Sequence, residues 1–251
     1  MVPEFVYYII FIITGLLIGS FLNVVIYRIP QKISIAGRRS FCPDCHDMIA
    51  FYDNIPLISF LILKGHCRHC NKKISFFYPL VEALTGALFL LNYLYFGISL
   101  KTLSGIILCS VLIIVSFIDI GHKIIPNIIV LPFTAIGLSL STVEYIHKWW
   151  LPLVFCAGTF AFMLIINLIY PEGMGMGDVK LGMMIGAFLV KGTIAALFLG
   201  FLTGSIFGLS MIAAKKKKMK QTIPFGPFMS IGSIIALFWG HNIIKWYISF
   251  F

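Results

Sequence analysis

The chain is a series of long apolar stretches separated by short breaks that carry charge, proline or glycine. A membrane-spanning helix needs about 20 predominantly apolar residues. Such stretches do not alternate as barrel strands do, and a backbone in hydrocarbon must satisfy its own hydrogen bonds, so each is predicted to be a helix. The candidate stretches are 5–27, 79–97, 102–119, 124–142, 151–170, 178–190, 193–213 and 225–248. We therefore expect an all-α polytopic membrane protein with about eight transmembrane helices.

Composition agrees with this pattern. Of 251 residues, 60% are hydrophobic and 11% are charged, and the mean hydropathy is +1.01, far from the usual values of a soluble domain. The first stretch has no basic region before it and no small-residue cleavage site after it, so we interpret it as a retained helix rather than a signal peptide.

The distribution of Lys and Arg predicts the orientation, because basic residues near helix ends resist translocation. If the amino terminus is outside, fifteen of the 19 basic residues fall on the inner side, including the run Lys215 to Lys218. The four outer ones are Lys101, Lys148, Lys191 and Lys245. Both termini are therefore expected on the outer side of the membrane. The basic residues that give the net charge of +10 are sorted by side of the membrane, and no nucleic-acid recognition module accompanies them. We therefore expect them to contact lipid head groups and expect no nucleic-acid partner.

One segment, 28–78, is polar and basic and holds four of the six cysteines. We predict that it is a small cytoplasmic insertion between a first transmembrane helix, 1–27, and a membrane core, 79–251.

The insertion contains two C-x-x-C pairs, with cysteines at positions 42, 45, 67 and 70. Cys42, Cys45, Cys67 and Cys70 have the spacing by which two loops present four thiolates to one zinc. A redox pair or unliganded thiols are the alternatives, and a histidine at position 46, 66 or 69 could replace a thiolate. Four thiolates leave no position for water, so the zinc is predicted to be structural.

Acidic side chains are costly at membrane depth and therefore suggest function. Asp119 ends the third stretch, Asp178 begins the sixth, and Glu82 lies one turn inside the second. Two carboxyls at one depth are the minimum for an aspartic protease, one ionised to activate water and one protonated to polarise the amide carbonyl. Because Asp178 begins a helix and Asp119 ends one, helix dipoles favour Asp178 as the ionised member. Taken singly, each acid could also be a helix-end residue at the water interface.

Asp178 follows Gly175 and Gly177 in a Gly-x-Gly-Asp sequence, with Lys180 two positions later. Glycines leave room for a substrate backbone, although they also occur where membrane helices pack. A transporter with intramembrane acids is the main alternative function, but the acids lie near the cytoplasmic margin and no matching pair of broken helices is evident. A zinc metalloprotease is excluded because no H-E-x-x-H occurs.

An ordered series of motifs resembles the type IV prepilin leader peptidases, a family of GxGD aspartic proteases. The resemblance rests on residues 19–28, 42–45, 54–56 with Ser59, 65–70, 74–75, 78–82, Asp119 with Pro126, 175–181 and 224–228. Asn127 departs from the pattern, since many relatives have an acid after this proline.

The resemblance implies more than the residues alone. It implies that Asp119 and Asp178 form the catalytic pair. It implies prepilin or pseudopilin substrates, cleavage at the cytoplasmic face, and N-methylation of the new amino terminus with S-adenosylmethionine. It also marks Glu82, Gly175, Gly177 and Lys180 as possible contacts of the substrate or the methyl donor.

Overall fold

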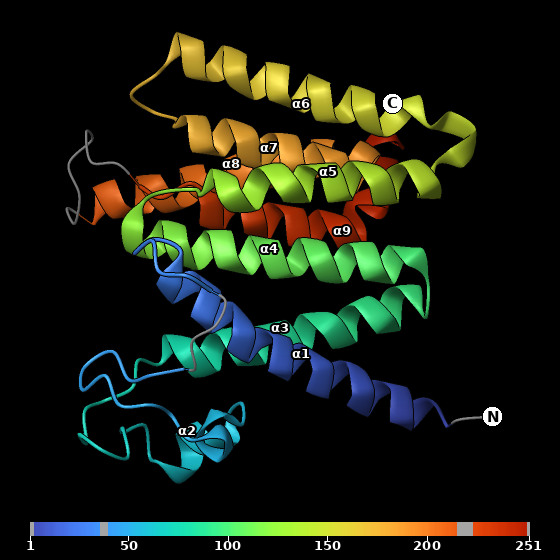
Figure 1. Cartoon of the computed structure of the whole chain (residues 1–251). Coiled ribbons are helices and arrows are strands. Elements are labelled where there is room, and N and C mark those ends of the chain that lie inside the picture. The colour runs from blue at the N-terminus through green and yellow to red at the C-terminus, as the bar shows by residue number, and fades with distance from the viewer. Residues whose placement is uncertain (1–2, 36–39, 215–222, 250–251) are drawn as a thin grey trace. The chain divides into compact units, whose positions relative to one another are not determined.

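The computed structural model describes residues 3–35, 40–214 and 223–249 (Figure 1). Within these residues the chain is helical and forms no β-strand beyond two isolated bridges. The helices are α1 (Glu4–Arg28), α2 (Ile58–Ile62), α3 (Phe77–Phe96), α4 (Leu100–His122), α5 (Asn127–Glu144), α6 (Trp150–Ile169), α7 (Met176–Leu189), α8 (Thr193–Ala213) and α9 (Gly226–Ile248). Three short 3₁₀ turns are η1 (Phe51–Asn54), η2 (Ile146–Lys148) and η3 (Val190–Gly192). The basic run Lys215 to Lys218 lies outside the described residues.

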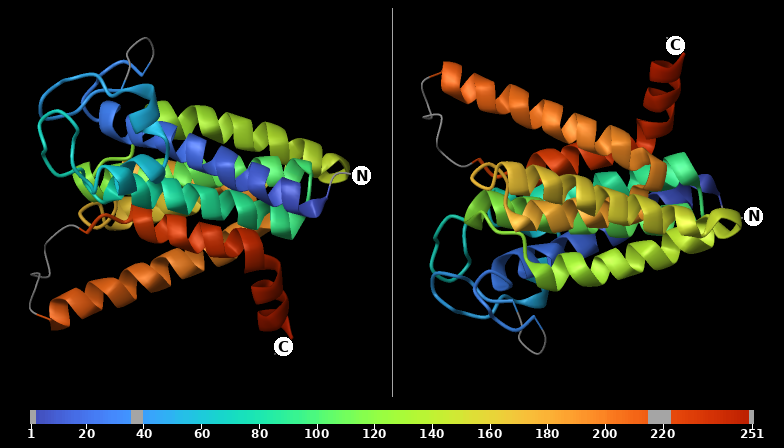
Figure 2. Two further views of the ribbon diagram at one scale, coloured as in Figure 1. Left: turned by 90° about the horizontal axis from the view of Figure 1, so that it is seen from below. Right: turned by 90° about the horizontal axis from the view of Figure 1, so that it is seen from above.

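The prediction of an all-α membrane protein is confirmed. Each of the eight apolar stretches coincides with one long helix, and the ends differ by no more than three residues. Among the described residues, seven helical segments are long and apolar enough to cross a membrane, because α7 and α8 count together as Met176–Met211. The reason is that α7 has only 14 residues, or about 21 Å at 1.5 Å per residue. Figure 2 shows that the chain reverses direction between α7 and α8, at η3.

The fourth stretch begins later than expected. Ile124 and Ile125 are apolar and were predicted to be helical, but α5 starts at Asn127. Pro126 disfavours helical geometry at the residue before it and acts as the N-cap of α5. The connection between α4 and α5 is therefore extended and carries Ile125 beside α7, where it contacts Gly177.

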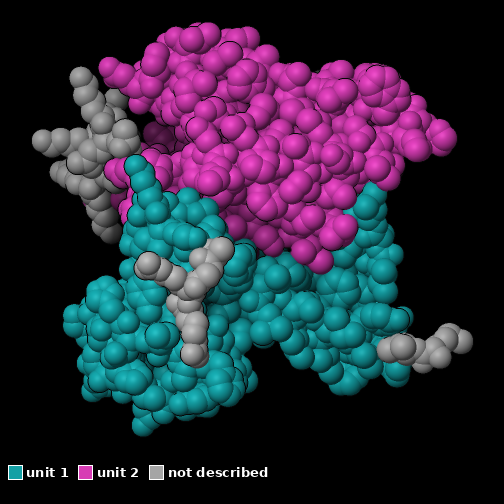
Figure 3. Space-filling model, in the orientation of Figure 1, with its two compact units in different colours: residues 1–102 teal, residues 103–251 magenta. Residues whose placement is uncertain are grey.

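The chain divides into two compact units, residues 1–102 and 103–251, which are coloured separately in Figure 3. In the first unit α1 packs along α3, and glycines allow close approach of the two backbones. A Cβ on Gly15 would lie 2.7 Å from the Cα of Gly86, and one on Gly19 would lie 2.7 Å from the Cα of Glu82. Small residues at such crossings are typical of membrane helices, since lipid offers no hydrophobic drive for helix association.

The insertion follows α1 in the same unit and contains two loops of matching geometry, with η1 and α2 between them. In the first, the N–H of Cys42 donates to the carbonyl of Asp47, and the N–H of His46 donates to that of Cys42. The second loop has the same two bonds: the N–H of Cys67 donates to the carbonyl of Lys72, and the N–H of Asn71 donates to that of Cys67. Each loop is closed by an isolated bridge, Phe41 to Met48 and His66 to Lys73. This repetition places both C-x-x-C pairs in equivalent turns.

In the second unit α7 is the central helix. It packs against α5, α6 and α9, and most of its side chains are buried. Gly186 permits a close approach to α6, since a Cβ there would lie 2.7 Å from the carbonyl oxygen of Phe155. The α8 helix packs mainly against α9, and α9 is joined to α4 by a hydrogen bond from the hydroxyl of Ser230 to the carbonyl of Leu112. The α7 helix, which carries Asp178 in its first turn, is thus packed against neighbouring helices on several sides.

Candidate functional site: two aspartates, a buried glutamate and a four-cysteine centre

Asp119 lies in the last turn of α4 and is only 5% exposed. Its Oδ2 accepts a hydrogen bond of 2.9 Å from the backbone N–H of Gly226. Gly226 is the first residue of α9, whose opening N–H groups have no partner within the helix. The carboxyl is therefore fixed by the end of another helix rather than by solvent.

Asp178 is the third residue of α7 and is half-buried. Its Oδ2 accepts a hydrogen bond of 3.0 Å from the backbone N–H of Gly175, which is the N-cap of the helix. This contact is one half of a capping box, in which an acid at the third position reaches back to the cap. The sequence Gly-x-Gly-Asp therefore both starts α7 and orients its carboxyl.

The structure brings the two aspartates together in the second unit, close enough for their charges to interact. Both carboxyls accept a backbone N–H at the start of a helix, Asp119 from α9 and Asp178 from α7. The sequence predicted that helix ends favour Asp178 as the ionised member. For Asp119 that prediction considered only α4, the helix that carries it. The start of α9 offsets the unfavourable end of α4 at Asp119, so the difference between the two aspartates is smaller than α4 alone suggests, and the ranking stays a prediction.

The neighbouring predicted contacts differ from one another. Gly175 is exposed, and the only atoms near a Cβ there would be those of the same turn, at 3.5 Å or more. Gly177 is different, because a Cβ there would lie 2.9 Å from the Cβ of Ile125. Lys180 donates a hydrogen bond of 3.0 Å to the side-chain oxygen of Asn127. Lys180 is therefore held by an uncharged amide at position 127.

Glu82 belongs to the first unit, where it lies in α3 and is 8% exposed. Its Oε2 accepts a hydrogen bond of 2.9 Å from the N–H of Leu57, in the insertion. Leu57 has φ 60° and ψ −45°, and the N–H of Ile58 donates to the carbonyl of Pro56 over 2.6 Å. This is a γ-turn of the rare, strained kind, so the carboxyl of Glu82 holds an unfavourable backbone geometry in place.

The four cysteines predicted to bind metal converge. The sulfur atoms of Cys42, Cys45, Cys67 and Cys70 all lie within 4.8 Å of one another, and those of Cys42 and Cys70 are 3.9 Å apart. Zinc with thiolates at about 2.3 Å in a tetrahedron separates its ligands by roughly 3.8 Å. The donor set is therefore of the right type and size for one such ion, and no histidine belongs to it among the described residues.

Backbone geometry prepares one of these thiols for metal binding. The N–H of Cys70, and after it that of His69, stabilises the thiolate of Cys67 and lowers the pKa of its thiol to about 7. Metals bind the thiolate rather than the thiol, so this shift favours Cys67 as a ligand, whereas the pKa values of Cys45 and Cys70 are raised in the absence of a metal.

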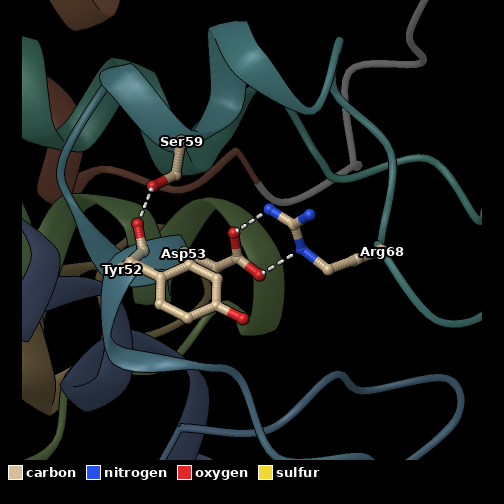
Figure 4. A network of polar contacts seen from close by, with 4 residues as sticks. All are labelled: Tyr52, Asp53, Ser59 and Arg68. Carbon is tan, nitrogen blue, oxygen red and sulfur yellow. Dashed lines mark hydrogen bonds and ion pairs between the residues drawn. The ribbon is translucent and has the colours of Figure 1, made fainter.

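One ion pair ties the second cysteine loop to η1, and another ties the two cysteine loops to each other. Arg68 binds Asp53 with both ends of its guanidinium, over 2.6 and 2.8 Å, as Figure 4 shows. The hydroxyl of Ser59 donates to the carbonyl of Tyr52 beside this pair. Lys72 of the second loop pairs with Asp44 of the first over 2.7 Å. The Arg68 guanidinium holds the pKa of the Asp53 carboxyl below its ordinary value, so the pair is charged at neutral pH.

Sequence reasoning missed three partners of the predicted site residues. Gly226, Leu57 and Asn127 each bind a predicted site residue through a hydrogen bond between segments far apart in the chain. A partial signal existed for Gly226, because Pro227 after it marks the first turn of a helix with free N–H groups. No signal in the sequence identified the acceptor of that N–H group.

Comparisons with known proteins cover nearly the whole chain. Residues 13–96 match the bacterial peptidase A24 N-terminal domain, and residues 106–209 match the type IV leader peptidase family. The chain is 38% identical to a prepilin leader peptidase/N-methyltransferase of Bacillus subtilis, over 95% of this chain and 97% of the relative. It is 35% identical to a protein of the same description from Legionella pneumophila, over 99% of this chain and 96% of the relative. No solved structure matches the chain.

Proposed function

Because this chain belongs to the type IV leader peptidase family, we propose that it is a bifunctional enzyme of the bacterial inner membrane. In this proposal it removes the basic leader from prepilins or pseudopilins at the cytoplasmic face and then methylates the new amino terminus. The transporter alternative is not favoured, since the relatives of known description are peptidases and methyltransferases.

We assign peptide hydrolysis to Asp119 and Asp178. The observation that carries this assignment is that two carboxyls from different helices lie within reach of each other's charge, each oriented by a backbone N–H. One carboxylate takes a proton from water as the water oxygen bonds to the scissile carbonyl carbon. The other carboxyl donates a hydrogen bond to the carbonyl oxygen, and a proton then passes to the leaving nitrogen as the C–N bond breaks.

The glycines beside Asp178 divide between two tasks in this mechanism. Gly175 keeps open space next to the carboxyl, so we propose that the backbone of the substrate passes there. The space beside Gly177 is taken by Ile125, which supports a role in packing α7 against the extended connection. Lys180, held by Asn127, supplies a positive charge two residues after the catalytic Asp178 and is proposed to contact the substrate.

Four thiolates at these separations support a structural zinc in the insertion. The insertion has few buried apolar side chains among its described residues, and a metal would supply folding free energy that such a short segment lacks. S-adenosylmethionine would supply an electrophilic methyl group on a sulfonium. The sorting of basic residues, fifteen against four, supports an orientation with both termini outside.

Cleavage of a prepilin by the purified protein in detergent tests the peptidase proposal. We expect Asp119→Asn and Asp178→Asn each to lower the cleavage rate by about 10²- to 10⁴-fold, because neither amide can exchange a proton as a carboxyl does. Each variant should still insert in the membrane and unfold at a temperature close to that of the unmodified protein. Normal processing by either well-folded variant would refute the assignment.

A further inference from the structure

The short helix α2 in the insertion exposes an apolar face that the peptidase site does not use. Ile58, Leu61 and Ile62 are three and four residues apart, so their side chains lie on one side of the helix, called here the α2 face. Leu61 is 73% exposed and Ile62 is 69% exposed, more than Leu17 in the transmembrane helix α1, at 56%. An apolar patch on a polar and basic segment indicates contact with a membrane or with another protein.

The opposite side of α2 is fixed to its own unit. Ser59 is buried, and its hydroxyl donates to the carbonyl of Tyr52. The N–H of Leu57, the N-cap of α2, donates to the carboxyl of Glu82 in α3. Leu57 and Lys64, which flank the helix, both have a positive φ, of 60° and 49°, and such strain persists only where the surroundings hold it. The α2 face therefore points outward in one fixed orientation.

The bond to Glu82 determines the depth of α2 in the membrane. The α3 helix has 20 residues, or about 30 Å at 1.5 Å per residue, and the hydrocarbon core is about 30 Å thick. Glu82 is the sixth residue of α3, so it lies about 7 Å from the start of this helix. Figure 1 shows α2 level with the first turns of α3, where the two are joined by that bond. This position corresponds to the boundary between hydrocarbon and lipid head groups.

The surroundings of α2 suit this boundary. Phe77 at the start of α3 is exposed, and the ring of Phe76 before it lies 6.5 Å from that of Phe60 in α2. Exposed apolar surface therefore continues from the transmembrane helix to α2. Lys64 and Lys73 are exposed and belong to neither of the ion pairs found in the described residues. Aromatic rings and free lysines are typical of the head-group region, where anionic lipids attract basic side chains.

From these observations we infer that α2 is an interfacial anchor, whose α2 face inserts among the acyl chains of the leaflet beside the insertion while Lys64 stays at the phosphate groups. The backbone of α2 fits this setting, because the N–H groups of Ser59, Leu61 and Leu63 donate to carbonyls within residues 55–59. The inference does not depend on the proposed peptidase or methyltransferase activity. It gives the insertion an attachment to the bilayer in addition to α1 and α3.

A tryptophan on the α2 face tests this inference in the full chain, with one copy in each nanodisc of phosphatidylethanolamine and phosphatidylglycerol. Interfacial helices bury their apolar face about 5–10 Å into the boundary, so Leu61→Trp should be quenched strongly by lipids brominated in the upper acyl chain and weakly by aqueous iodide. The signal of the four native tryptophans is measured on the unmodified protein and subtracted. His69→Trp, exposed in the second cysteine loop, is the aqueous control. Leu17→Trp on α1 is the lipid control.

The quencher that reaches the new tryptophan identifies what covers the α2 face. Quenching of Leu61→Trp by the brominated lipid, as in the lipid control, supports the anchor. Quenching by iodide as strong as in His69→Trp would place the face in water and overturn the inference. Shielding from both quenchers would mean that protein covers the face, and it would overturn the inference as well. Ile58→Trp, one turn earlier on the same face, carries the same test if Leu61→Trp unfolds at a lower temperature than the unmodified protein.

Discussion

The hydrogen bond between Gly226 and Asp119 offers a sharp test of how the peptidase site is positioned. In Gly226→Ala the new Cβ would lie 2.8 Å from Oδ2 of Asp119 and 3.3 Å from its Cγ. Real Cβ atoms do not approach this closely, so the carboxyl must rotate or shift by several tenths of an ångström. The substitution does not strain the backbone, because Gly226 does not adopt a positive φ, and alanine is favoured over glycine in a helix.

The expected effect is therefore catalytic. A hydrogen bond to a charged group contributes about 1.5–3 kcal/mol, and a shift of roughly 1 Å in a catalytic group can cost about a hundredfold in rate. We expect kcat/KM for prepilin cleavage to fall about ten- to a hundredfold in Gly226→Ala, with no loss of thermal stability. Initial rates on a purified prepilin, normalised to folded enzyme, measure this.

Gly121→Ala is the control for this experiment. Gly121 lies two residues after Asp119 in the same helix, and nothing lies within 4 Å of a Cβ built there. It should cleave at the unmodified rate. If Gly226→Ala also cleaves at that rate while well folded, the N–H of α9 does not position the catalytic carboxyl.

Three further predictions concern the insertion and the topology. Purified protein should carry about one zinc per chain, and serine at Cys42 and Cys67 together should lower the metal content measured by mass spectrometry; full occupancy in that double variant would exclude these thiols as ligands. Because the pKa of Asp53 is depressed in the folded state, its stabilising pair is complete above the ordinary value of 3.8 and is lost as the pH falls through the folded value. The difference in hydrogen exchange of the insertion between unmodified protein and Asp53→Asn should be present at pH 7 and vanish in acid, and a difference that grows in acid would have the wrong sign. A cysteine introduced near Lys148 should react with an impermeant reagent from outside, whereas one near Lys217 should not, and the reverse pattern would invert the proposed orientation.

The helices could be predicted from sequence because hydrocarbon allows only a helix over such apolar lengths. The start of α5 was placed three residues too early, since hydropathy does not register that Pro126 ends the extended connection. The convergence of the four cysteines was also predictable, because each C-x-x-C loop has a fixed local geometry and one metal needs both.

The partners of the acids could not be predicted in this way. Gly226 is 107 positions from Asp119, and their hydrogen bond depends on how α9 packs against α4. Leu57 and Glu82 are joined across 25 positions by a turn that propensity alone disfavours. The ranking of the two aspartates by helix ends left out α9 for the same reason, because it considered only the helix that carries Asp119, and it stays a prediction.

The shortness of α7 has a consequence for the bilayer around the catalytic pair. Its 14 residues span about 21 Å, whereas the hydrocarbon core is about 30 Å thick. The difference of roughly 9 Å must be met by local thinning of the bilayer or by entry of water. Since α7 begins beside Asp178, water that enters at this end would reach one of the two carboxyls that we propose to be catalytic. Peptidase activity should therefore depend on acyl-chain length, and thicker membranes should slow it.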